Sequence, residues 1–255
     1  MGSPRLASVV ERRLLVNYRT DPEITARLVP APLRPQVVDG WAVSGICLIR
    51  LRGVRPARPG ARGGAAAGWV GPSSENAAHR IAVEWDTPDG VATGVYIPRR
   101  DTGSRLNAWA GGRLFPGWHH RSDFRVRDDA DGLRVAVGDP DDGVRVDVHA
   151  RTATTLSGSH LFPGIDQASA FFRHGATGFS TTPDPARLDG VRLHTGHWQV
   201  TPMTLVSVRS TFFDDPVRFP PGSAVPDCAL LMRDVPATWI PLPPMPVRPV
   251  PATTR

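Results

Sequence analysis

The sequence predicts a mainly β protein, with antiparallel strands and a few short helices in a single domain over residues 1–255. Two observations lead to this prediction. Proline (27 residues) and glycine (25 residues) together exceed a fifth of the chain, which favours short strands and turns over long helices. Segments in which apolar and polar residues alternate recur along the chain, and Asp-Gly dipeptides typical of hairpin turns separate many of them.

The first part of the chain is predicted to hold a strand, a short helix and a hairpin. Residues 11–19 (ERRLLVNYR) have the composition of a strand. A helix follows in residues 20–30, because either of the first two residues can cap it and a proline stops it. Residues 37–51 then predict a hairpin that turns at Asp39-Gly40.

Two segments are predicted to lie outside regular structure. Residues 53–72 (GVRPARPGARGGAAAGWVGP) have low complexity, and we interpret them as a flexible loop within the domain because strand-like sequence resumes after them. Residues 236–255 form a proline-rich C-terminal tail, which is expected to lie over the surface as an extended polyproline segment.

The remaining chain is predicted to alternate between strands and turns, with one further helix. Residues 165–174 (IDQASAFFRH) predict this helix, and Gly175 ends it. Asp189-Gly190 predicts a turn before a long strand. The predicted strands of this region are 80–86, 91–97, 198–213 and 227–235, with three more within 124–150.

Charge and cysteine content restrict the partners and the compartment. The formal net charge is +6, but the arginines are scattered and often alternate with apolar residues, so we do not expect a nucleic-acid partner. Cys47 and Cys228 lie in apolar runs, which indicates two reduced thiols in the core. No segment has the pattern of a signal peptide or a membrane span, so we expect a cytoplasmic protein with no membrane partner. The sequence leaves oligomer formation open.

The familiar catalytic and cofactor-binding motifs are missing from this sequence. It contains no G-x-S-x-G, P-loop, H-E-x-x-H or G-x-G-x-x-G pattern, and we expect no cofactor. The His119-His120 pair and the His194/His197 pair have a spacing that a metal ion can use, but histidines exposed in loops are more common than metal ligands. We therefore predict no metal site.

A dense group of polar residues lies between residues 96 and 121. Arginine forks bind carboxylates in a bidentate manner, and the glycines of this stretch allow a close approach of the backbone. The alternative is a salt-bridged cap over the mouth of a barrel. The candidates for substrate binding are Arg99, Arg100, Arg105, Asn107, Trp109 and Arg113, and the candidates for proton transfer or hydrogen bonding are Tyr96 and His119.

Glutamate is rare in this chain, with four residues against twenty aspartates, and two of the four flank one strand-like segment. Glu75 and Glu84 lie at the two ends of SENAAHRIAVE, and Glu84 shares one face of the alternating strand with Ala82. If that face is a lumen, either glutamate is a candidate catalytic base. The alternative is an ordinary exposed glutamate on a strand.

Three strings of residues resemble a known family. LLVNYRTDPEITARLVPAPLRPQVVDGWAVSGICLIRL, SSENAAHRIAVEW and VYIPRRDTGSRLNAWAGGRLFPGWHH are similar to the YqjF-like family of uncharacterised proteins, which is related to the acetoacetate decarboxylase superfamily. The similarity covers roughly residues 10–235. It implies an α+β fold whose strongly curved antiparallel sheet closes into a cone or barrel around a central cavity, with short peripheral helices.

The absence of lysine separates this chain from decarboxylases of that type, which form an imine with a substrate carbonyl. All 30 basic residues are arginine, and a guanidinium cannot form an imine. The resemblance then implies an enzyme that acts on a small carboxylate or β-oxo acid by acid–base chemistry: enolisation, dehydration, aldol-type cleavage or decarboxylation. The alternative is a non-catalytic β-barrel that binds a small molecule in an aromatic pocket lined by Trp41, Trp85 and Trp109.

Overall fold

Within the described residues, fourteen strands make one curved sheet, and two short helices accompany it. The computed structural model describes residues 4–57, 72–105, 116–139, 141 and 143–250. The strands are β1 (Leu6–Thr20), β2 (Arg34–Pro35), β3 (Val37–Val38), β4 (Trp41–Pro56), β5 (Ser74–Thr87), β6 (Gly90–Thr102), β7 (His119–Arg121), β8 (Asp123–Asp129), β9 (Gly132–Gly138), β10 (Arg145–Thr152), β11 (Thr177–Thr181), β12 (Arg187–Thr195), β13 (Thr201–Ser210) and β14 (Ala224–Pro246). The helices are α1 (Pro22–Ala26) and α3 (Ile165–His174).

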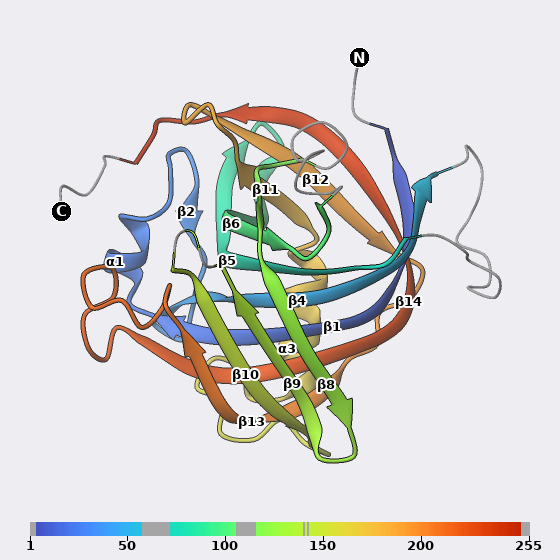
Figure 1. Cartoon of the computed structure of the whole chain (residues 1–255). Coiled ribbons are helices and arrows are strands. Elements are labelled where there is room, and N and C mark those ends of the chain that lie inside the picture. Colours follow the sequence, from blue (N-terminus) through green and yellow to red (C-terminus); the bar gives the residue numbers. More distant parts are fainter. Residues whose placement is uncertain (1–3, 58–71, 106–115, 140, 142, 251–255) are drawn as a thin grey trace.

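Seven strands close into a ring, as the predicted barrel requires (Figure 1). Their order is β1–β4–β5–β6–β11–β12–β14, and β14 pairs back onto β1 along the whole length of β1. The mainly β prediction and the closure are therefore confirmed, but the sheet is mixed, because β6 pairs in parallel with both β11 and β7. A long crossover that contains four further strands (β7 to β10) and α3 separates β6 from β11, and such crossovers permit parallel pairing.

The other long strands form a second layer outside the ring. β13 pairs with β14, and the sheet continues through β10 and β9 to β8. In Figure 1 this layer lies across the lower front of the molecule. It packs on the outer face of β1 and β4, where Leu14 and Ile46 meet Val135 and Val148 in a cluster that excludes water. Because strand side chains alternate, the neighbours of Leu14 and Ile46 point into the ring.

The interior of the ring contains a second apolar core. Helix α3 covers it, with Ala168 and Phe172 against Leu15 of β1 and the side chains of Cys47 and Cys228. Both cysteines are buried and free, which confirms the prediction of two core thiols. The helix prediction for residues 165–174 matches α3, and Gly175 is its C-cap.

Local turn chemistry accounts for several elements that the sequence predicted. The hairpin between β3 and β4 turns at Asp39 and Gly40, which have positive φ angles of 48° and 79°. The Asp21 side chain accepts hydrogen bonds from the backbone N–H groups of Glu23 and Ile24 and so caps α1.

Two predictions of local structure are wrong. Asp189-Gly190 is not a turn but lies inside β12, at a register shift. A Cβ at Gly190 would lie 3.0 Å from both Leu242 Cβ and Phe179 Cε1, so the glycine allows close approach of neighbouring chains and does not mark a reversal.

The proline-rich tail is also different from the prediction over its first residues. Residues 236–246 continue β14 and pair with β12. Beyond Trp239, β14 has no β1 partner, so a proline that lacks an N–H can face the unpaired edge without loss of a ladder hydrogen bond. Of the predicted loop at residues 53–72, the structure describes residues 53–57 and 72, and β4 continues to Pro56.

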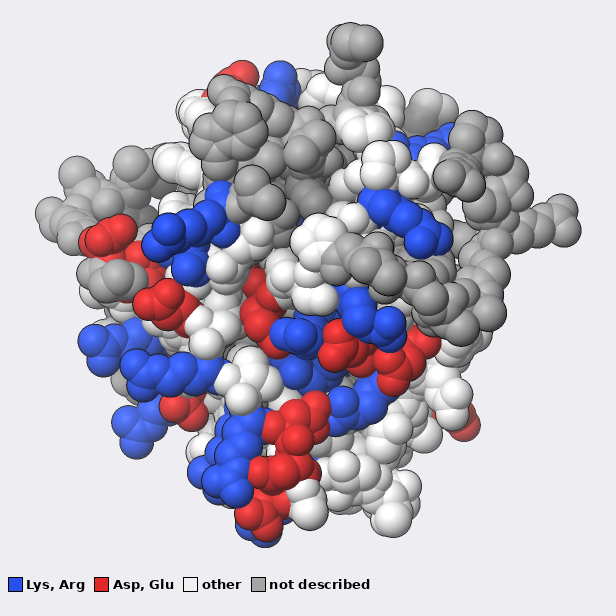
Figure 2. Space-filling model, turned by 45° about the vertical axis from the view of Figure 1, so that its right-hand side comes forward, with Lys and Arg blue, Asp and Glu red and all other residues white. Residues whose placement is uncertain are grey.

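Charges are mixed on the surface. Figure 2 shows basic and acidic side chains next to one another over the face in view. Between β14 and the outer layer, for example, Arg233 binds both carboxylate oxygens of Asp128 of β8, at 2.8 and 2.7 Å. No helix among the described residues is long and apolar enough to span a membrane.

Candidate functional site

Strand β6 presents two consecutive arginines to opposite faces of the ring. Arg99 lies opposite His79 of β5, and the His79 ring stacks on Phe212 beneath the outer layer. Arg100 lies opposite Ala78, which belongs to the interior core. The two guanidinium groups therefore have separate surroundings and separate partners.

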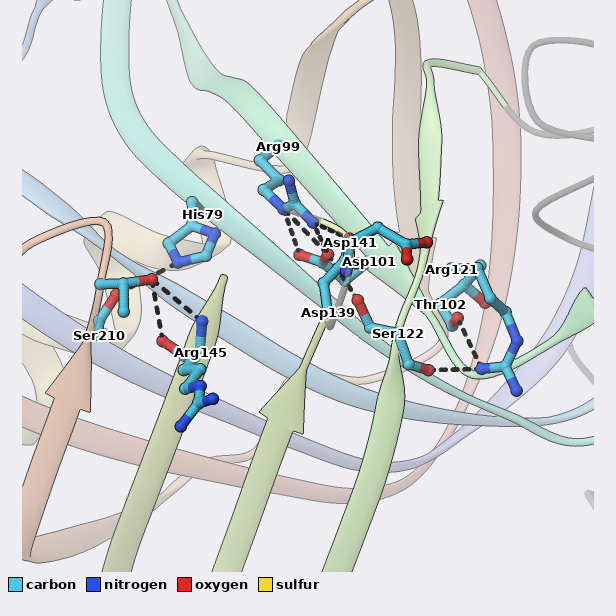
Figure 3. A network of polar contacts seen from close by, with 11 residues as sticks. His79, Arg99, Asp101, Thr102, Arg121, Ser122, Asp139, Asp141, Arg145 and Ser210 are labelled. Carbon is cyan, nitrogen blue, oxygen red and sulfur yellow. Dashed lines mark hydrogen bonds and ion pairs between the residues drawn. The ribbon is translucent and has the colours of Figure 1, made fainter. Parts of the chain in front are cut away.

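Arg99 is held in an ion-pair cluster outside the ring (Figure 3). Its Nη2 lies 2.7 Å from Asp101 Oδ1 and 2.7 Å from Asp139 Oδ2, and the side chains of these aspartates are only 1% and 5% exposed. The Ser122 hydroxyl donates a further hydrogen bond to Asp101. This arrangement joins β6 to the outer layer, and it occupies the guanidinium that was a candidate for binding substrate.

A small cavity lies inside the ring, with a volume of about 50 Å³. A water molecule needs roughly 10–15 Å³ of such space, so the cavity has room for a few small groups, such as a carboxylate. Two of the predicted site residues, Arg100 and His119, line it. The full lining is Ile49, Leu51, Asn76, Ala77, Arg100, Asp101, Pro116, His119, Val191 and Trp239.

Arg100 has no carboxylate partner among the described residues. Its Nε donates a 2.7 Å hydrogen bond to Ser180 Oγ, and it takes part in no ion pair there. Burial lowers the pKa of Arg100 to about 10, so the group remains charged at neutral pH. Gly117 makes room for this contact, because a Cβ at that position would lie 2.4 Å from Ser180 Cβ. Its φ of 92° also favours glycine.

His119 lies beside Arg100, because β7 pairs with β6 at these two residues. Burial, and then the charge of Arg100, lower the pKa of His119 to about 3, so the imidazole is neutral at pH 7. Its Nδ1 lies 3.0 Å from the Gly117 carbonyl oxygen, which can only accept a hydrogen bond. The proton is therefore on Nδ1, and Nε2 keeps the lone pair that a base needs.

A second buried guanidinium, Arg80 of β5, was not predicted from the sequence. It is 4% exposed, and it donates a short hydrogen bond to Asn17 Oδ1 and lies 4.8 Å from the centre of the Phe172 ring. It forms no ion pair within the described residues, and its Nε has no hydrogen-bond partner. Burial lowers the pKa of Arg80 to about 10. The sequence contained one signal for Arg80: by strand alternation it lies on the same face as Ala78 and Ala82.

The two glutamates lie away from the cavity. Glu75 Oε2 is 2.7 Å from Arg12 Nη2, and Glu75 Oε1 is 3.2 Å from Arg50 Nη1. Glu84 is half-buried at the far end of β5, where Arg34 binds it at 2.8 Å. Both carboxylates are therefore engaged in ion pairs with strand arginines, and neither lines the interior cavity.

The remaining predicted residues divide between other places. Tyr96 is buried with Phe179 and Ile81 in a separate apolar cluster outside the ring, and burial raises its pKa to about 12. Arg105 is exposed. Asn107, Trp109 and Arg113 lie outside the described residues. No group of three or more potential metal ligands occurs in the part of the chain that the structure describes.

The fold and site together define a class: a ring-shaped β-barrel with an interior cavity lined by a neutral histidine and by an arginine that has no carboxylate partner among the described residues. No protein-family model and no curated protein matches the sequence. Solved structures share the fold. Acetoacetate decarboxylase from Legionella pneumophila is 10% identical with a TM-score of 0.60, and the match covers 97% of this chain and 88% of that one.

Two further structures with this fold extend the comparison. An acetoacetate decarboxylase-like enzyme from Sphingomonas wittichii is 13% identical with a TM-score of 0.56, over 98% of this chain and 94% of that one. The enduracididine biosynthesis enzyme MppR in complex with pyruvate is 14% identical with a TM-score of 0.54, over 94% of this chain and 89% of that one. The protein therefore has the fold of the acetoacetate decarboxylase-like superfamily.

Proposed function

We propose that the protein is an acetoacetate decarboxylase-like enzyme that acts on a small carboxylate or β-oxo acid by acid–base chemistry, without an imine. The observation that carries this proposal is the pairing of Arg100 with His119 at the cavity inside the ring. Within the superfamily we place the chain among YqjF-like proteins, on the sequence strings that include Tyr18-Arg19-Thr20-Asp21. Pyruvate in complex with the similarly folded MppR supports the choice of a small oxo acid.

Arg100 provides the binding step in this proposal. A buried guanidinium without a counter-ion is costly to the folded protein, and a substrate carboxylate would supply the missing charge. The terminal nitrogens of Arg100 are the donors, because its Nε is already bonded to Ser180. Arg80 adds positive potential to the same interior.

His119 provides the proton transfer. Its Nε2 takes a proton from the carbon next to the substrate carbonyl, the C–H electron pair becomes the enolate double bond, and the carbonyl π electrons move to oxygen. Transfer of this proton from Nε2 to the enolate oxygen gives the enol, and its return to carbon, or the return of a solvent proton in its place, regenerates the keto acid. A bound carboxylate offsets the Arg100 charge that depresses the pKa of His119, so binding makes the imidazole a stronger base.

Proton exchange of pyruvate tests the proposal directly. The parent protein in D₂O should accelerate deuterium incorporation into the methyl group of pyruvate, measured by proton NMR. His119→Gln should bind pyruvate but lose the acceleration, and Arg100→Met should lose binding by roughly ten- to a hundredfold. Arg121→Met is the matched control, because this exposed arginine lies on the same short strand as His119 and should change neither result.

Two outcomes would overturn the proposal. One is a parent protein that binds neither pyruvate nor acetoacetate. The other is an internal peptide modified after incubation with acetoacetate and borohydride, because a chain without lysine has no internal amine for an imine.

A non-catalytic barrel that binds a small molecule is the second candidate function. The observation that favours it is the largely apolar wall of the cavity, with Ile49, Leu51, Val191 and Trp239, together with the position of Glu75 and Glu84 away from it. Binding of a carboxylate that depends on Arg100, without any proton exchange, would select this candidate. Exchange that depends on His119 would exclude it.

A further inference from the structure

A second recess lies at the end of β12, and no residue lines both this recess and the interior cavity. Its volume is about 340 Å³, within the range of roughly 300–1,000 Å³ typical of small-molecule sites. β12 contributes Arg192, Leu193, His194 and Thr195. Arg173 at the end of α3 and Arg13 of β1 also line it, and His197 and Trp198 complete the lining together with Ala176.

The charge of this recess is of one sign. Three arginines and two histidines line it, and no aspartate or glutamate does. Arg13, Arg173 and Arg192 take part in no ion pair among the described residues, although many other arginines of this chain do. Three guanidinium groups around one recess repel one another, and an anion with more than one charge relieves this repulsion.

The guanidinium groups of Arg13 and Arg192 are held in place, but some of their N–H groups remain available as hydrogen-bond donors. Arg13 Nε contacts Cys47 Sγ at 3.4 Å, and Arg192 Nε contacts Thr177 Oγ1 at 3.4 Å, both long contacts. The terminal nitrogens of both side chains have no acceptor in the described part of the protein. The Arg13 guanidinium also lies 5.8 Å from the centre of the Trp198 ring, and Trp198 Nε1 donates to Ser169 Oγ of α3 at 2.9 Å. One wall of the recess is therefore anchored to α3.

We propose that this recess binds a small phosphomonoester, with the phosphoryl group between Arg13, Arg173 and Arg192. A phosphoryl dianion accepts from several guanidinium forks at once, which a single carboxylate does not. The recess is larger than a phosphate ion requires, and the apolar faces of Leu193 and Trp198 remain for the organic part of the ligand. This site is independent of the proposed reaction at Arg100.

Titration calorimetry with glycerol 3-phosphate and inorganic phosphate tests the proposal. Arg192→Gln and Arg173→Gln are suitable changes, because both side chains are exposed and their loss leaves no buried group without a partner. Each should weaken binding of glycerol 3-phosphate by roughly ten- to a hundredfold, and added salt should weaken binding to the parent. Arg13 is left intact because it contacts Cys47 inside the ring.

Two controls distinguish binding in this recess from a general effect of surface charge and from binding in the interior cavity. Arg187→Gln removes an exposed arginine of the same strand that lies outside the recess and pairs with Asp189, so binding should not change. Arg100→Met should retain phosphomonoester binding, whatever its effect on oxo acids. The proposal is overturned if the parent does not bind glycerol 3-phosphate, or if Arg187→Gln weakens binding as much as Arg192→Gln. Tighter binding of citrate than of either phosphate compound would overturn the phosphoryl assignment.

Discussion

Replacement of Arg80 by methionine tests whether the interior of the ring holds a charge without a counter-ion. Arg80 is 4% exposed and has no carboxylate within ion-pair distance among the described residues. Methionine keeps the length and flexibility of the side chain and removes the charge. If the guanidinium serves a ligand, its removal should change the stability of the ligand-free protein very little.

The expected change in the free energy of unfolding follows from the pKa of Arg80. Burial lowers the pKa of Arg80 from 12.5 to about 10, and at about 1.4 kcal/mol per unit this corresponds to a penalty of roughly 3 kcal/mol for the charged form. The hydrogen bond to Asn17 and the contact with the Phe172 ring offset it by about 1–2 kcal/mol each. The free energy of unfolding of Arg80→Met should therefore lie within about 1 kcal/mol of the parent value.

Arg99→Met is the control, because Arg99 has the buried partners that Arg80 lacks. Its loss leaves Asp101 and Asp139 without their shared cation and should lower the free energy of unfolding by about 3–5 kcal/mol. Urea denaturation at pH 7, in a buffer without carboxylate or phosphate, measures both variants. If Arg80→Met is destabilised as strongly as Arg99→Met, Arg80 has a counter-ion in the folded protein and the reasoning fails.

Three further predictions concern buried groups of the fold. Burial lowers the pKa values of His79 and His119 to about 3, below the 6.5 of an unfolded histidine, so the unfolded state binds more protons between pH 6.5 and 3. On acidification through that window, these two residues should together lower the free energy of unfolding by roughly 3 kcal/mol per pH unit. In urea titrations, His79→Gln should remove about half of this slope. Equal slopes in the parent and the variant would contradict the prediction. Gly117→Ala should destabilise by about 3 kcal/mol, through its positive φ and the 2.4 Å approach to Ser180, whereas Gly222→Ala, with a φ of 86° and open space around it, should lose about 1 kcal/mol in thermal unfolding. Cys47 and Cys228 are 8% and 4% exposed, and burial raises the pKa of Cys228 to about 12, so a thiol reagent should modify them only after unfolding; rapid reaction of the native protein would show an opening to the core.

The sequence determined the elements whose signals are local. Alternation and turn chemistry predict the β3–β4 hairpin, and residues 165–174 carry the helix signal within ten residues. The same local rules failed at Gly190 and along residues 236–246, because there the deciding contacts come from strands far away in the chain. Proline does not mark a turn where it lies at an unpaired strand edge. Glycine does not mark a turn where a neighbouring strand approaches too closely for a Cβ.

The absence of lysine, and with it the exclusion of an internal imine, follows from the sequence alone. Which arginine faces the cavity did not, because Arg99 and Arg100 are adjacent and of the same type, and only the register of β6 in the closed ring assigns them to opposite faces. Closure of the ring through β1 and β14 also brings Arg80, Asn17 and Cys228 together across more than two hundred residues of chain. Side-chain type is a property of the sequence, but desolvation and the absence of a counter-ion are properties of the neighbours, and these exist only once the sheet has closed.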